Sequence, residues 1–370
     1  MNLLSEVSHL VLECQYTLQV CRSRCIDQYD EVYARLGVSF DSYTGESQVS
    51  KDTMDEVLKI MGEKGLLDDS GGARAINLKA HGGRHGTAII MTREGSSTYL
   101  LRDIAAVIER HREYAFDKML YVVAADSNKT HFVRIFKILE LMGMKNIAEK
   151  LHHVSFCENS QMSSQQGGQP TLGTVFDTCR AATITALSSD TASAGMRELK
   201  SIDADALCSS AFFAHVSSTR CSASLNFDAA HLASSDRGSA IELLQWHSKF
   251  KNLQHEFSNL TIRDGAESTS KKAGTAQIED EAGLQGEQQE DARSNLLRLL
   301  ARFPETLEAA LHSNEPSHIA TYLNSLIGFL KIWFPDPVDF HAEDETQRNL
   351  LRASSIVVDT SLRLLGVTRR

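Results

Sequence analysis

The chain passes from an extended segment into a helix within Ser97-Thr98-Tyr99-Leu100-Leu101-Arg102-Asp103-Ile104-Ala105-Ala106. Tyr99 and Asp103 are four residues apart, so both side chains are expected on one face of the first helical turn. A phenol and a carboxylate at this spacing can together hold a cationic ligand. The alternative is that Tyr99 packs and Asp103 only caps the helix or complements its N-terminal dipole.

The segments around this helix predict an α/β fold. Short apolar runs predict strands at Thr87–Thr92, Met119–Ala125 and His153–Cys157. Helical patterns fall at Asp103–Glu113, His131–Met142 and Asn146–Lys150. The order β-α-β-α-β predicts a parallel sheet with right-handed crossovers. Ligands of such sheets bind at the carboxyl ends of the strands, which is where Tyr99 and Asp103 are expected.

Helices are predicted for most of the remaining chain. Residues 1–37 have apolar positions at helical spacing, and Asp52–Lys64 reads as an amphipathic helix that begins after Ser50 as N-cap and ends before Gly65. Arg263–Asp291 has almost no large apolar side chains, which predicts a disordered loop. The expected segments are 1–178 (partial α/β domain with a helical N-terminal segment), 179–260 (helical connection), 261–293 (disordered acidic and polar loop) and 294–370 (helical bundle).

Composition excludes several classes of protein. A hydrophobic content of 42% and a charged content of 23% are typical of a soluble globular protein, and no apolar run is long enough to span a membrane. The net charge of −10 argues against nucleic-acid binding through the overall field, so any such contact needs a local basic face. The seven cysteines lack the paired spacing of a zinc site, and we expect no metal and a cytoplasmic location.

Several segments resemble the arginyl-tRNA synthetases, which are class I enzymes. They are Tyr29–Leu36, Phe40–Val49, Tyr99–Ala106, Phe116–Val123, Phe136–Gly143 and the helices from Asn295 onward. The resemblance implies an incomplete Rossmann-like catalytic domain with a parallel sheet, followed by an α-helical bundle of the anticodon-binding type. The fold class is then α/β plus all-α.

The resemblance also assigns residues to the two substrates. It implies that Glu46, Tyr99 and Asp103 hold the guanidinium of the arginyl group, as two carboxylates and a phenol can. The local basic face for tRNA phosphates would be formed by the arginines of the last helix and tail: Arg348, Arg352, Arg363, Arg369 and Arg370. The alternative for these arginines is a solvated basic end of a helix.

The two signatures with which the family handles ATP are not found in the sequence. No His-x-Gly-His occurs, and the chain begins about where the family is past the first half of its nucleotide-binding fold. In Gln161–Gly167 the family's basic pair is replaced by Gln165 and Gln166. Two neutral amides cannot neutralise a transferring phosphate. We therefore expect no ATP-dependent activation and no cofactor.

The loop after the second strand is the expected place for acid–base chemistry. His131 matches a family histidine that approaches the bound arginine and nucleotide, whereas Asp126–Thr130 does not match the family. One interpretation is a rebuilt site in which His131 or Asp126 transfers a proton and Ser47 or Ser127 forms a covalent intermediate. The other is a helix N-terminus capped by Asp126 or Ser127.

Three functions remain open. The first is an arginine-containing cyclodipeptide synthase, resembling those of filamentous fungi, which joins arginine to a second amino acid from arginyl-tRNA and a second aminoacyl-tRNA. The aminoacyl ester is already activated, so amine attack needs only positioning and proton transfer. The second is a non-catalytic, synthetase-derived module that binds tRNA. The third is an ordinary arginyl-tRNA synthetase whose remaining half lies upstream.

Overall fold

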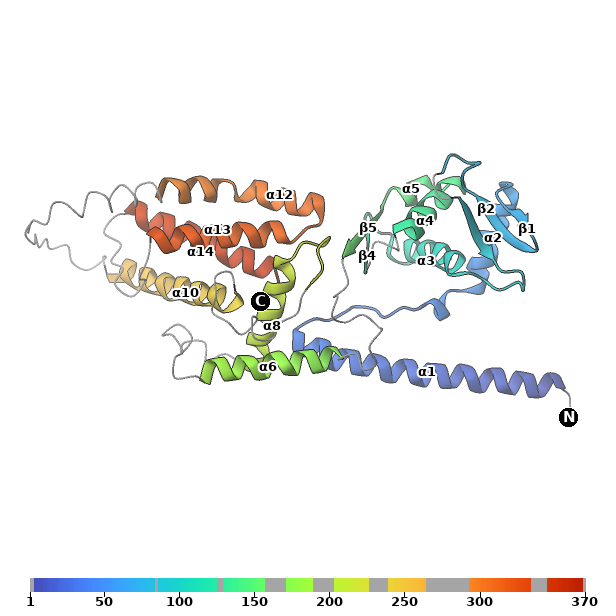
Figure 1. Ribbon diagram of the computed structural model, residues 1–370, viewed down its shortest axis with the longest axis horizontal. Coiled ribbons are helices and arrows are strands. Elements are labelled where there is room, and N and C mark those ends of the chain that lie inside the picture. The colour runs from blue at the N-terminus through green and yellow to red at the C-terminus, as the bar shows by residue number, and fades with distance from the viewer. Residues whose placement is uncertain are drawn as a thin grey trace, which may run out of the picture. The chain divides into compact units, whose positions relative to one another are not determined.

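The computed structural model describes residues 3–83, 86–124, 129–156, 171–188, 203–225, 239–263, 293–333 and 345–368 of the chain. Two compact units can be distinguished, and each has its own hydrophobic core (Figure 1). The α/β unit comprises Phe40–Glu158 and Cys221–Ser224. The helical unit comprises Met1–Ser39, Asn159–Arg220 and Leu225–Arg370. An α/β part and an all-α part are therefore both present, as predicted.

The first sheet of the α/β unit is antiparallel. It consists of β1 (Asp68–Ser70), β2 (Ala73–Asn77) and β3 (Thr87–Met91), in that order. Gly71 and Gly72 form the β1–β2 turn with φ angles of 63° and 88°, a backbone conformation that glycine adopts without steric cost. This short connection reverses the chain, which makes the pairing antiparallel.

The second sheet contains the parallel pair that the sequence predicts. β4 (Met119–Ala124) pairs with β5 (Leu151–Phe156), in a register that sets Tyr121 beside His153. The expectation for Thr87–Thr92 as a strand of this parallel sheet was wrong, because the strand β3 (Thr87–Met91) pairs with β2 in the antiparallel sheet. The reason is local: the segment before it supplies a hairpin partner, β2, that was not recognised as a strand.

The helices of the α/β unit follow the predictions closely. They are α2 (Lys51–Glu63), α3 (Tyr99–Tyr114), α4 (Lys129–Leu141) and α5 (Lys145–Ala148), with a short 3-10 turn η1 (Glu46–Gln48) before α2. Ser50 caps α2, since its Oγ accepts a hydrogen bond of 3.1 Å from the backbone N–H of Asp52. Ile90, Leu101, Ile104 and Ile138 belong to the buried core that joins the antiparallel sheet to α3 and α4.

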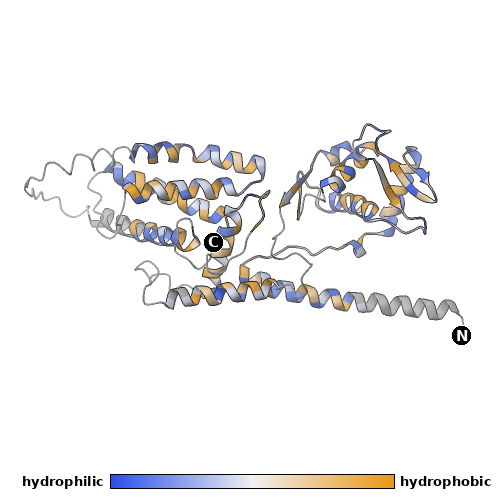
Figure 2. Cartoon of the chain, viewed as in Figure 1, coloured by the Kyte–Doolittle hydropathy of each residue, from blue (hydrophilic) through white to orange (hydrophobic). Residues whose placement is uncertain are grey.

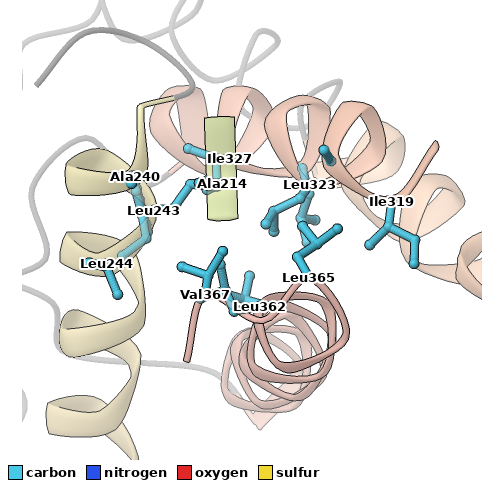
Figure 3. Close-up of a cluster of buried hydrophobic side chains, with 14 of the residues drawn as sticks. Ala214, Ala240, Leu243, Leu244, Ile319, Leu323, Ile327, Leu362, Leu365 and Val367 are labelled. Atoms are coloured by element: carbon cyan, nitrogen blue, oxygen red, sulfur yellow. The ribbon is translucent and has the colours of Figure 1, made fainter. Parts of the chain in front are cut away.

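The described residues of the helical unit include seven labelled helices. They are α1 (Leu3–Leu36), α6 (Leu172–Ser188), α8 (Ala204–Ser218), α10 (Ala240–Arg263), α12 (Phe303–Ser313), α13 (Ser317–Trp333) and α14 (Glu345–Leu364). Apolar side chains of α8, α10, α13 and α14 meet in one core (Figure 3). Hydrophilic and hydrophobic residues alternate along these helices (Figure 2), so each can bury one face and expose the other.

The N-terminal helix is tied to the helical unit at its end. Arg35 donates to Asp177 over 2.7 Å and to Asp205 over 3.2 Å, and Ser209 Oγ donates to the carbonyl of Leu36 over 2.7 Å. Leu36 is buried in the helical core. The predicted segment 1–178 is thus divided in the structure, because residues 1–39 pack with the helical unit and 40–158 form the α/β unit.

Some predicted features lie outside the described residues. They are Asp126, Ser127, Gln165, Gln166, Arg369, Arg370 and nearly all of the expected loop at Arg263–Asp291. Among the helices that are described, none combines the length and the apolar character needed to cross a membrane.

Candidate functional site

The N-terminal end of α3 is anchored on β3. Thr98 Oγ1 donates to the backbone carbonyls of Ile89 and Ile90 at 3.0 and 2.9 Å, and the backbone N–H of Thr98 also donates to Ile90. Since Thr98 is the N-cap of α3, these bonds fix where the helix begins. The hydrogen bonds of Thr98 therefore hold the start of α3, and with it Tyr99 and Asp103, in place against β3.

Glu46 and Tyr99 both contact the guanidinium of Arg102, a residue of the same chain. Arg102 Nη1 donates to Glu46 Oε2 over 3.2 Å, and the guanidinium carbon lies 5.8 Å from the centre of the Tyr99 ring. Ser97 also binds this guanidinium, because its Oγ and its backbone carbonyl accept hydrogen bonds from Arg102 Nε and Nη2 at 3.0 and 3.3 Å. Tyr99 remains 66% exposed.

Asp103 and His131 form a second pair beside this cluster. Asp103 Oδ2 lies 2.6 Å from His131 Nε2, which joins the first turn of α3 to the first turn of α4. The side chains are 39% and 30% exposed, so solvent reaches both. A carboxylate in this position orients the imidazole ring. His131, predicted as a proton acceptor, is thus in direct contact with a residue predicted to bind the arginyl group.

Two residues near these pairs were not identified from the sequence. Arg102 lies between Tyr99 and Asp103 on α3, but its pairing with Glu46 depends on how η1 packs against α3. Tyr121 lies in a predicted strand, where a phenol reads as a packing residue. In the structure its ring contacts Phe132 at 4.9 Å between centroids, and burial raises the pKa of Tyr121.

The other predicted site residues do not join the contacts around Arg102 and Asp103. Ser47 is exposed on η1, next to Glu46. Arg348 and Arg352 are exposed on α14, one turn apart, and Arg363 pairs on the same helix with Asp359 at 3.5 Å. Among the described residues, no group of three or more His, Cys, Asp or Glu side chains could hold a metal ion.

Two family models match this chain. Residues 14–223 match the model described as "tRNA synthetases class I (R), catalytic domain", and residues 265–369 match the "DALR anticodon binding domain". The first match covers more than half of the chain. The chain belongs to the class I arginyl-tRNA synthetase family. The predicted fold class, a class I catalytic domain followed by a helical anticodon-binding domain, is therefore confirmed.

Curated relatives are similar along nearly the whole chain. The cytoplasmic arginine–tRNA ligase of Saccharomyces cerevisiae is 28% identical over 353 residues, which are 94% of this chain and 55% of that protein. The mitochondrial arginine–tRNA ligase of the same yeast is 27% identical over 94% of this chain and 52% of its own length. The chain thus spans about half the length of these relatives.

Solved structures share the fold. The crystal structure of arginyl-tRNA synthetase from Plasmodium falciparum matches with a TM-score of 0.72 and 17% identity, over 96% of this chain and 58% of that one. Thermus thermophilus arginyl-tRNA synthetase matches with a TM-score of 0.70 and 15% identity, over 98% and 65%.

Proposed function

We propose that this member of the arginyl-tRNA synthetase family binds an arginyl group at the N-terminal end of α3 and tRNA through its C-terminal helices, and that it takes part in arginine–tRNA ligation. The observation that carries the proposal is the Arg102 cluster. Glu46 and Tyr99 already accommodate one guanidinium between them, at hydrogen-bond distance from the carboxylate and near the face of the ring.

Asp103 supplies the second carboxylate of the proposed site. It is the next residue after Arg102 on α3, and its partly exposed carboxylate pairs with His131 rather than with a permanently charged guanidinium. An ion pair between partly exposed groups is weak, so an arginyl guanidinium can displace the imidazole from Asp103 at little cost. His131 would then be released beside the bound arginyl group, where it can accept a proton.

The test of arginine binding uses Asp103→Asn, which keeps the side-chain volume and removes the charge. Calorimetric titration with arginine should show binding weakened by about 1 kcal/mol, because the guanidinium loses its charged partner at a site that solvent reaches. Asp55→Asn is the matched control, since it removes an exposed carboxylate from α2 in the same unit. Equal affinities of Asp103→Asn and the unchanged protein would rule out Asp103 as the arginine ligand.

Ligase activity is favoured by the relatives, which are named arginine–tRNA ligases. It predicts arginine-dependent exchange of pyrophosphate into ATP, and charging of tRNA with arginine. Both assays should be run on the full chain with arginine and with lysine as the control amino acid. Binding of arginine and tRNA without exchange or charging would leave recognition intact and exclude the ligase.

A second candidate is the arginine-containing cyclodipeptide synthase. The observation in its favour is in the sequence, where Gln165 and Gln166 replace a basic pair of the family. The substrates would be arginyl-tRNA and a second aminoacyl-tRNA. The α-amine of one residue would attack the ester carbonyl of the other while His131 accepts the proton, and the ester bond breaks to release the first tRNA. The remaining α-amine would then attack the second ester, which closes the ring and releases the second tRNA. Extracts of a host that expresses the chain should then contain an arginine diketopiperazine, which mass spectrometry detects. If neither this product nor arginyl-tRNA forms, a non-catalytic tRNA-binding module is left.

The cytoplasmic location stays a prediction. The two yeast relatives carry the names cytoplasmic and mitochondrial, so the family includes both locations.

A further inference from the structure

Two cysteines lie on the buried faces of neighbouring helices in the helical unit. Cys179 is on α6 and Cys208 is on α8, and their side chains are 1% and 0% exposed. Both belong to the core of the unit, and both thiols are free. On α8 the next buried position, Ala211, is small, so α6 can approach this part of the helix closely. The two thiols are therefore enclosed by the core.

Printed contacts on both sides of Cys179 lead from α6 to α8. The S–H of Cys208 is 3.7 Å from the carbonyl of Phe176, one turn before Cys179. Arg180, the residue after Cys179, pairs with Asp205 of α8 over 2.7 Å between Nε and Oδ1. These contacts fix the register of the two helices, and they bring the Cys208 thiol within hydrogen-bond reach of the Cys179 sulfur as well.

The end of α1 holds the same two helices. Arg35 pairs with Asp177 of α6 and Asp205 of α8, and its guanidinium lies 4.5 Å from the centre of the Phe176 ring. The ion pairs and the ring contact therefore surround the cysteines on the side of α1. A bond between the two sulfurs would join helices that are already held together.

The contact between the two thiols divides their chemical roles. The hydrogen bond from Cys208 lowers the pKa of Cys179, whereas the same contact and burial raise the pKa of Cys208. The Cys179 sulfur is thus the better nucleophile, and Cys208 stays a protonated thiol beside it. A thiol is only a weak hydrogen-bond donor, so the contact adds little to stability in itself. What two adjacent thiols can do together is form a disulfide.

We propose that Cys179 and Cys208 are an oxidation site, at which a small peroxide such as hydrogen peroxide forms a disulfide between α6 and α8. The Cys179 sulfur attacks one peroxide oxygen and the O–O bond breaks, which leaves a sulfenic acid and, with the thiol proton, one water. The Cys208 sulfur then attacks the Cys179 sulfur, the S–O bond breaks, and a second water leaves. Two thiols lose two electrons, and the peroxide gains them. This inference does not depend on the proposed function.

Blocking the exposed thiols first makes the test specific. Cys21 and Cys25 of α1 are exposed, so iodoacetamide should modify them in the native full chain and leave Cys179 and Cys208 free. Hydrogen peroxide is then added to the native chain, because it is small enough to reach thiols that a bulkier reagent does not. Modification of Cys179 as fast as that of Cys21 would overturn the enclosed site.

Mass spectrometry identifies the product. The oxidised chain is denatured, its remaining thiols are blocked, and it is digested without reduction by trypsin and Glu-C. Cleavage after Glu158 separates Cys179 from Cys157. We expect a peptide of residues 159–180 joined to one of residues 201–220, lighter than their sum by two hydrogen atoms. Failure to find this product, or sulfonic acid in its place, would overturn the proposal.

The disulfide should also stabilise the helical unit, since it shortens the unfolded chain's range of conformations. Oxidation should lower the unfolding equilibrium constant by about 100-fold. Urea titration followed by the fluorescence of Trp246 and Trp333 measures it, because both belong to the core that contains the cysteines. Dithiothreitol should reverse the change.

Cys208→Ser is the matched control, because its hydroxyl keeps nearly the size of the thiol and can still donate to the carbonyl of Phe176. Peroxide should leave its urea midpoint unchanged. Cys179→Ser should behave in the same way and replaces it if Cys208→Ser does not fold. A peroxide-induced gain of stability that persists in either variant would overturn the assignment to this pair.

Discussion

His247 is a buried imidazole of α10, with its Nε2 3.0 Å from Asp359 Oδ1 on α14. Burial is the largest influence and lowers the pKa of His247, Lys251 lowers it further, and the hydrogen bond and charge of Asp359 raise it only in part. The folded state thus binds the proton less readily than the unfolded chain does. The helical unit should therefore lose stability as the pH falls through the unfolded pKa of about 6.5 towards the lower folded value.

The measurement for His247 compares urea midpoints at pH 7.5 and 5.5, read from tryptophan fluorescence. Both tryptophans of the chain, Trp246 and Trp333, belong to the helical core, so this signal reports the helical unit. His247→Gln cannot gain the proton and should show a smaller difference between the two pH values. A difference as large as in the unchanged chain would assign the effect to other groups.

At the scale of elements, α3 ends in a strained conformation. Ala115 is its C-cap, with φ 45° and ψ 38°, and its backbone N–H donates to the carbonyl of His111. A left-handed backbone costs an alanine roughly 1–2 kcal/mol, whereas glycine adopts it freely. Ala115→Gly should therefore stabilise the end of α3 by about 0.5–1 kcal/mol. The helix α12 offers the control, because its C-cap Asn314 has φ 53° and asparagine tolerates this region.

Hydrogen exchange of peptides from the C-terminal turn of α3 can measure the change. Ala115→Gly should slow exchange there, whereas Asn314→Gly should change exchange at the end of α12 much less. Faster exchange in Ala115→Gly would mean that the greater conformational entropy of glycine in the unfolded state outweighs the backbone strain that the substitution relieves.

The same elements explain which parts of the fold can be predicted from sequence. The helix α2 carries its signals locally, with Ser50 as N-cap and Gly65 after its end, and it was found within a residue or two. The strand β2 is short and follows two glycines, so it gives no clear periodic signal. Without it, the antiparallel pairing of β3 could not be predicted, because strand pairing depends on the partner that tertiary contacts supply.

The candidate site shows the same limit. Tyr99 and Asp103 share a helical turn, so their spacing alone places them together. Glu46 was added by the family resemblance, and its link to this turn depends on Arg102, which the spacing of charges does not reveal. The surroundings of Tyr121 depend on what β4 packs against, which is Phe132 of α4, and only the folded structure contains that information.

At the scale of the whole molecule, the residues proposed for the two substrates lie in different units. Glu46, Tyr99 and Asp103 belong to the α/β unit, and Arg348 and Arg352 belong to the helical unit. Each unit has a separate core, so substitutions in one should not alter the stability of the other. The tRNA proposal can therefore be tested without disturbing arginine binding.

The net charge of −10 makes the proposed tRNA contact depend on local arginines. Arg348 and Arg352 are both exposed, one turn apart on α14, within the segment that matches the anticodon-binding domain. Each phosphate that they neutralise releases bound counterions, so the double variant Arg348→Gln, Arg352→Gln should reduce the slope of log affinity against log salt by roughly 1.5–2. Filter binding of tRNA at a series of salt concentrations gives this slope.

The control must separate local contacts from the overall field. Lys59→Gln with Lys145→Gln removes the same two charges from the α/β unit, where both lysines form exposed pairs with glutamates one turn away. If only the total charge matters, both double variants should bind tRNA equally weakly at low salt, and both salt slopes should change alike. If α14 contacts the phosphates, only the arginine variant should lose slope, because counterion release counts the phosphates that are actually contacted.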